Sequence, residues 1–189
     1  AGAGPAGEAL VRVNLGALRL HEDFWPGINR DTSHQPRPPH RLYVDMARAL
    51  RSQADTDAQR LQEVLARTPG LDDTHPVLAQ RLAALGVAPA LPAPPRESAA
   101  EALLGPLLPA LEQRFSDEWA DWAAPRWEAR YQEAEADRRR LAELEARAAA
   151  GPLDGVDAVE HACLLQDFRP ELDPLPGLEA ALARCPEHA

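Results

Sequence analysis

The chain has 189 residues and a net charge of −10, from 30 acidic residues and 20 basic residues that are all arginine. Arginines dispersed through an acidic chain argue against a nucleic-acid partner, because phosphate backbones need a clustered basic face. No apolar run reaches the length of a membrane span and no signal-peptide pattern opens the chain, so we expect neither in this segment.

Composition also predicts an all-α fold. Apolar residues make up 45% of the chain but aromatic residues only 5%, and the dominant alanines and leucines favour closely packed helices over a sheet. Nineteen prolines should cut the chain into an irregular bundle or array of about eight helices. The absence of lysine, beside abundant Ala, Arg, Gly and Pro, is typical of a GC-rich bacterial genome. The sequence does not indicate a cellular compartment.

Apolar residues at helical spacing predict four helices in the first 86 residues. The first should end at Pro26-Gly27, before a proline-stiffened polar loop over residues 31–39. Thr56 is expected to cap the third helix and Thr74 the fourth, which would have Pro76 in its first turn and Gly86 as its stop. The four helices are expected at residues 5–25, 40–53, 57–67 and 76–85.

Four prolines within residues 87–96 predict an extended linker. We place a boundary at residues 87–97, between a helical region over 1–86 and another over 98–189. Ser98 and Glu101 have the spacing of a capping box at the start of the second region. Its helices are expected at residues 98–105, 107–123, 125–150, 154–168 and 175–185, with Gly151-Pro152 closing the long one.

The last two helices, over residues 154–185, resemble a tetratricopeptide unit followed by Pro186. Such a unit needs neighbours to cover its outer face, so this end looks cut from something longer, and so does the start, which lacks Met. Cys163 and Cys185 have no metal-binding spacing and are expected to be buried thiols.

Two strings imitate parts of a zinc-peptidase site. The stretch from His21 to Trp25 begins with His-Glu, but a zinc helix needs a second histidine four residues after the first. The stretch from Glu133 to Arg138 resembles the string that supplies a third zinc ligand in some metallopeptidases, but the paired histidines before it are absent. We therefore read both as solvated helix faces and predict no metal site or cofactor in this chain.

Aromatic residues gather around Pro125. Trp119, Trp122, Trp127 and Tyr131 fall on the two helices expected on either side of that proline. Aromatic anchors at a helical corner usually belong to the core, but an exposed pair would suit a surface that binds a peptide or protein partner.

The most specific pattern runs from Asp72-Asp73-Thr74-His75-Pro76 through Gln80-Arg81 to Gly86. It resembles the Thr-His-Pro segment that follows the catalytic helices in M48-family zinc metallopeptidases, the group of HtpX and Ste24. The preceding order of helix, Phe-Trp, Pro-rich loop and further helix resembles the same family. The motifs cover the first 86 residues. The remainder is similar only in being an Ala-Leu-rich helical region that ends in repeat-like helices.

This resemblance implies that His75 lies near the zinc of the parent protein and stabilises the charge that develops on the scissile carbonyl, with Arg81 in support. The zinc ligands and the general base have no matching positions, so zinc is implied for the parent and not for this chain. The implied partner is the catalytic part of the same polypeptide.

Three functions follow from these observations. The leading hypothesis is a non-catalytic carboxy-terminal part of a zinc metallopeptidase that completes or gates the parent active site. The alternative is a helical-repeat module that binds a peptide or protein in a groove. A third is an unrelated helical protein whose dimer interface covers its apolar faces.

Overall fold

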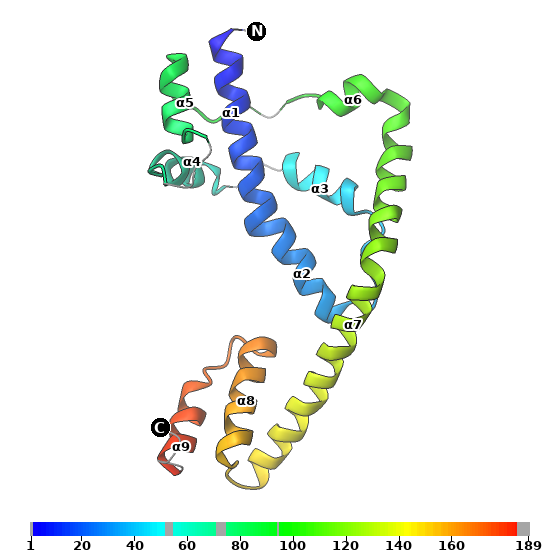
Figure 1. Ribbon diagram of the computed structural model, residues 1–189, viewed down its shortest axis with the longest axis vertical. Coiled ribbons are helices and arrows are strands. Elements are labelled where there is room, and N and C mark those ends of the chain that lie inside the picture. Colours follow the sequence, from blue (N-terminus) through cyan, green and yellow to red (C-terminus); the bar gives the residue numbers. More distant parts are fainter. Residues whose placement is uncertain (1, 52–54, 71–74, 94, 185–189) are drawn as a thin grey trace. The chain divides into compact units, whose positions relative to one another are not determined.

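The computed structural model describes residues 2–51, 55–70, 75–93 and 95–184 (Figure 1). Every regular element in these ranges is helical, which confirms the all-α prediction. None of the described helices combines the length and the apolar character that a bilayer span requires. The chain divides into two compact units: unit 1 is Ala1–Asp31 with Pro38–Ala124, and unit 2 is Thr32–Arg37 with Pro125–Ala189.

Unit 1 is built around α1 (Ala3–Leu18), which packs against α4 (Asp57–Leu65) and α5 (Leu78–Leu85) (Figure 1). Their apolar faces meet because leucines and valines recur at three- and four-residue steps on each helix. The buried cluster consists of Val11, Leu15, Leu18, Leu61, Val64, Leu78 and Leu82. This burial fixes α5 against α1, and with it the position of the residues just before α5.

The chain turns back onto α1 directly after α5. Gly86 ends that helix in the left-handed conformation, with φ of 66°, which confirms its predicted role as the stop. Val87 then approaches α1 so closely that a Cβ at Gly7 would lie 2.8 Å from a methyl carbon of Val87. Glycine at position 7 therefore makes room for the start of the Pro-rich segment.

The first helical segment does not end at Pro26-Gly27. α1 continues into a π-helix over Arg19–Phe24 and then into α2 (Trp25–His34), so the predicted loop over 31–39 is helical as far as residue 34. The backbone N–H of Trp25 donates to the carbonyl of Leu20, five residues back. Because this hydrogen bond spans five residues instead of four, a different carbonyl lies opposite Pro26, which has no N–H to donate. The helix therefore continues through Pro26.

Pro125 does not separate two helices either. The expected helices at 107–123 and 125–150 form one, α7 (Leu108–Ala150), with Pro125 inside it. The helix is anchored on each side of the proline, because Ala123 is buried in unit 1 and Trp127 in unit 2. This anchoring offsets a cost of about 3 kcal/mol for an interior proline.

Unit 1 also contains α3 (Leu42–Arg51) and α6 (Ala99–Leu104). The predicted capping box at the start of α6 is confirmed, because Glu101 N–H donates to the Ser98 hydroxyl and Ser98 N–H donates to the Glu101 carboxylate. The predicted cap at Thr56 is wrong. Thr56 has helical dihedral angles, and its side chain accepts no capping hydrogen bond.

Unit 2 contains the C-terminal part of α7 together with α8 (Gly155–Phe168) and α9 (Leu175–Arg184). α8 packs against α9 (Figure 1), so a helix pair forms over the described residues 155–184 of the region predicted to hold one; its tetratricopeptide character stays a prediction. Cys163 is exposed, not buried, because its neighbours Ala162 and Leu164 take the buried positions of α8. Cys185 lies outside the described residues.

The described part of the predicted linker at 87–97 is free of helix, as the prolines predict. It lies within unit 1, and the two units divide after Ala124. A domain boundary at 87–97 stays a prediction.

Candidate functional site

His75 and Arg81 lie at the start and in the middle of the segment held by α5. Both side chains are exposed, whereas Leu78 and Leu82 are buried against α1. The helix begins at Leu78, with Val77 as an extended N-cap, so the expected start at Pro76 is two residues early. The predicted cap Thr74 lies outside the described residues. The segment is thus anchored by its leucines and presents its imidazole and guanidinium outward.

A zinc site needs several His, Cys, Asp or Glu side chains close together in space. Among the described residues, no group of three His, Cys, Asp or Glu side chains is arranged to hold a metal ion.

The His21–Trp25 stretch takes up a packing role in unit 1. Asp23 accepts two hydrogen bonds of 2.8 Å from the guanidinium of Arg60 on α4. The hydrogen bond from Arg60 holds the pKa of Asp23 below its usual value. The stretch thus contributes an ion pair between the π-helix and α4, at an exposed edge of the unit.

Two of the four candidate aromatic residues lie in unit 1. Trp122 is 75% exposed, whereas Trp119 is half-buried and its ring lies 6.5 Å from the ring of Trp25. Phe115 comes one i, i+7 step before Trp122 on the same face of α7, and its ring meets Tyr43 of α3 edge-on at 6.1 Å. Both Phe115 and Tyr43 are exposed. The sequence-based interpretation missed this pair.

The other two candidates lie in unit 2. Trp127 is only 4% exposed, and its indole N–H donates to the backbone carbonyl of Gln35 over 2.7 Å. It therefore ties the residues 32–37 to α7 within this unit and offers no surface to a partner in this structure. Tyr131 is half-buried. The four aromatic residues are thus divided between the two units.

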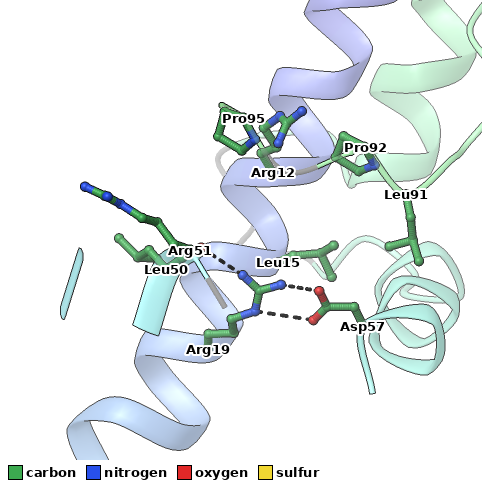
Figure 2. Close-up of a pocket in the computed structure, with 9 residues that line it drawn as sticks. All are labelled: Arg12, Leu15, Arg19, Leu50, Arg51, Asp57, Leu91, Pro92 and Pro95. Carbon is green, nitrogen blue, oxygen red and sulfur yellow. Dashed lines mark hydrogen bonds and ion pairs between the residues drawn. The ribbon is translucent and has the colours of Figure 1, made fainter. Parts of the chain in front are cut away.

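A pocket of about 120 Å³ lies in unit 1, and both charged and apolar side chains line it, some of them from the Pro-rich segment (Figure 2). At its base the guanidinium of Arg19 forms a salt bridge with Asp57, and both side chains are at least nine-tenths buried. Arg19 also donates to the carbonyl of Leu50 over 3.0 Å. The charge of Arg19 is thus matched by a carboxylate inside the fold.

Arg12 lies between Pro92 and Pro95 at the mouth of this pocket (Figure 2) and donates to the carbonyl of Ala93 over 2.6 Å. The side chain of Arg51 extends away from the buried ion pair (Figure 2) and pairs with Glu101 at 2.8 Å. Each arginine is thus engaged by groups of unit 1. The hydrogen bond of Arg12 connects the Pro-rich segment to α1.

Sequence could have pointed to one half of this ion pair. Arg19 follows Leu15 by four residues and Val11 by eight, which places a charge on the apolar face of the first helix. A charge in that position needs a partner. Nothing local indicates that the partner is Asp57, 38 residues further along.

In comparisons with known proteins, no family model, no curated protein and no solved structure matches this chain.

Proposed function

We propose that this chain is a non-catalytic part of a zinc metallopeptidase of the M48 family, where it completes or gates the active site of the parent protein. The observation that carries the proposal is the arrangement around α5. Leu78 and Leu82 hold the segment in the core of unit 1, while His75 and Arg81 are exposed. The two polar residues are therefore available to another part of the same polypeptide.

An exposed imidazole suits the role that the sequence resemblance gives to His75. Its N–H can donate a hydrogen bond to an oxyanion as negative charge develops on a peptide carbonyl. Arg81 lies six residues further along the chain and adds a positive charge on the same anchored element. The metal and its ligands would belong to the catalytic part of the parent.

The first test concerns the parent protein itself. We expect the reading frame upstream of Ala1 to encode a His-Glu-x-x-His helix, and we expect this chain alone, incubated with zinc and casein, to cleave nothing. Robust cleavage by the isolated chain, or an upstream frame without that helix, would overturn the proposal.

The second test measures His75 in the parent enzyme. Removing a single oxyanion donor costs about 10²–10³ in kcat, so His75→Ala should lose activity on that order while zinc content stays unchanged. His34→Ala, at the exposed end of α2, is the matched control and should keep full activity. Wild-type turnover in His75→Ala would contradict the assigned role.

A second candidate function is a helical module that binds a peptide or protein. It is favoured by the exposed aromatic face of Tyr43, Phe115 and Trp122 in unit 1, because aromatic side chains are enriched among the residues that dominate binding energy. Peptides selected from a displayed random library should bind this chain, and Trp122→Ala should weaken that binding at least tenfold. Val13→Ala, at an exposed apolar position on α1, should not, and equal effects of the two variants would refute this function.

A further inference from the structure

Acidic side chains lie next to the exposed aromatic residues of unit 1. Phe115 and Trp122 are seven residues apart on one face of α7, and Glu118 lies between them, one turn before Trp122. Asp121 directly precedes Trp122, and both acidic side chains are exposed. Over residues 108–124, the part of α7 that belongs to unit 1, the sequence has four acidic residues and one arginine. The exposed rings therefore lie on a negatively charged helix segment.

The two carboxylates nearest to Trp122 are open to a cation from outside. Among the described residues, Asp121 has no hydrogen-bond or ion-pair partner. Glu118 pairs with Arg114 at 2.7 Å, and both of these side chains are more than half exposed. An exposed pair of this kind contributes little to stability. The carboxylate of Glu118 can therefore exchange Arg114 for another cation at little cost.

Charge discriminates between the possible occupants of this face. A second copy of the chain would bring a net charge of −10 and the same acidic segment toward these carboxylates, and like charges across an interface are unfavourable. An anionic membrane surface is repelled in the same way. A cationic side chain, in contrast, is attracted both by the carboxylates and by the face of an indole ring, which is the best ring for a cation–π contact.

We propose that this face binds a basic segment of another protein, in which an arginine or lysine lies on the ring of Trp122 and pairs with Asp121 or Glu118. This inference rests on the peptide-binding function proposed above and names the partner of that site. The rings of Phe115 and Tyr43 lie one i, i+7 step away, about 10 Å along the helix, and take up an apolar side chain of the same segment. A helical segment that lies along α7 provides this spacing between residues i and i+7 of one face.

The first experiment selects peptides from a displayed random library on the full chain and on the double variant Glu118→Gln with Asp121→Asn. We expect the peptides selected on the wild-type chain to be enriched in arginine and lysine. The enrichment should disappear on the double variant, which keeps the shape of the face without its charge. The matched control, Asp167→Asn with Glu171→Gln, removes two exposed carboxylates of unit 2 and should select the same peptides as the wild type.

The second experiment measures the affinity of one selected peptide by fluorescence anisotropy. Replacing its arginine or lysine by glutamine should weaken binding to the wild-type chain by about twofold to fivefold, the value of one exposed ion pair, and should change little on the double variant. Trp122→Leu keeps an apolar side chain but removes the ring. This variant should also reduce the preference for the basic peptide over its glutamine counterpart.

The outcomes distinguish this inference from the function on which it rests. If the selected peptides bind at Trp122 without basic residues, or if the preference for basic peptides survives in the double variant, the inference is overturned and the peptide-binding function stands. If the library yields no binder, both are overturned. A dimer in light scattering that Trp122→Ala dissociates would assign the face to a second copy and would also overturn both.

Discussion

The interactions that stabilise unit 1 internally differ from those that stabilise unit 2. Unit 1 buries seven valines and leucines in one cluster and encloses the ion pair of Arg19 and Asp57. The corresponding cluster in unit 2 has three leucines, Leu141, Leu144 and Leu164, and the pocket between α8 and α9 is lined in part by alanines. The stability of unit 1 therefore rests on the volume of its buried side chains and on a buried ion pair. The stability of unit 2 rests more on ion pairs at its surface.

Those ion pairs join α7 to α8. Arg140 donates to Asp157 over 2.9 Å and to Glu160 over 2.7 Å, and Arg147 also pairs with Asp157. The hydrogen bond from Arg140 lowers the pKa of Glu160 and raises the pKa of Arg140 itself. Because this network is partly exposed, salt should weaken it more than the enclosed pair of unit 1.

The largest expected effect comes from unpairing the buried arginine of unit 1. Asp57→Ala leaves the buried charge of Arg19 without its carboxylate partner and should reduce the free energy of unfolding by about 3–5 kcal/mol. Urea denaturation followed by circular dichroism measures this. The double variant Arg19→Met with Asp57→Leu should recover most of the loss, and a double variant as unstable as Asp57→Ala would show that lost packing, not the unpaired charge, is responsible.

The next effect compares the two cores by deleting one leucine from each. Leu82→Ala, in the seven-member cluster, should lose about 2–5 kcal/mol of unfolding free energy. Leu164→Ala should lose less, because a thinner core with small neighbours relaxes more readily around the deletion. Amide exchange in α1 and in α8 reports the two losses separately. Equal losses would remove the contrast between the units.

A smaller effect is expected from pH and salt on the α7–α8 network. A carboxyl group whose pKa is lowered in the folded state stabilises the fold above its unfolded pKa, and this contribution disappears as pH falls through the folded pKa. Amide protection of α8 should therefore weaken as pH falls below the ordinary glutamate pKa of about 4.3 through the lower folded pKa of Glu160. Glu160→Gln should flatten this dependence, and an unchanged profile in that variant would exclude Glu160 as its source.

The smallest effect concerns the edge of unit 1. Ser98→Ala removes the capping box of α6 and should cost about 1 kcal/mol, confined to that helix because α6 has no buried residues. Amide exchange in α6 measures the change. Thr56→Ala is the matched control, since the side chain of Thr56 makes no capping hydrogen bond in the structure. A comparable loss of protection in α4 of that variant would support the cap predicted from the sequence.

The resemblance named His75 and Arg81 from sequence, and their exposure could be inferred in part, since they fall off the apolar stripe of α5. The aromatic pair of Phe115 and Tyr43 could not be found in this way. Its members come from helices 72 residues apart in the sequence, and only the packing of α3 beside α7 brings their rings to 6.1 Å.

The helical class, the capping box at Ser98, the stop at Gly86 and the apolar faces that pack in unit 1 could all be predicted from the sequence. These features depend on hydrogen bonds and dihedral preferences within a few residues. Tertiary packing, in contrast, decides that one helix continues through Pro125 and that Arg19 pairs with Asp57. In each of these the outcome depends on burial between distant segments, a free-energy term that no local window contains.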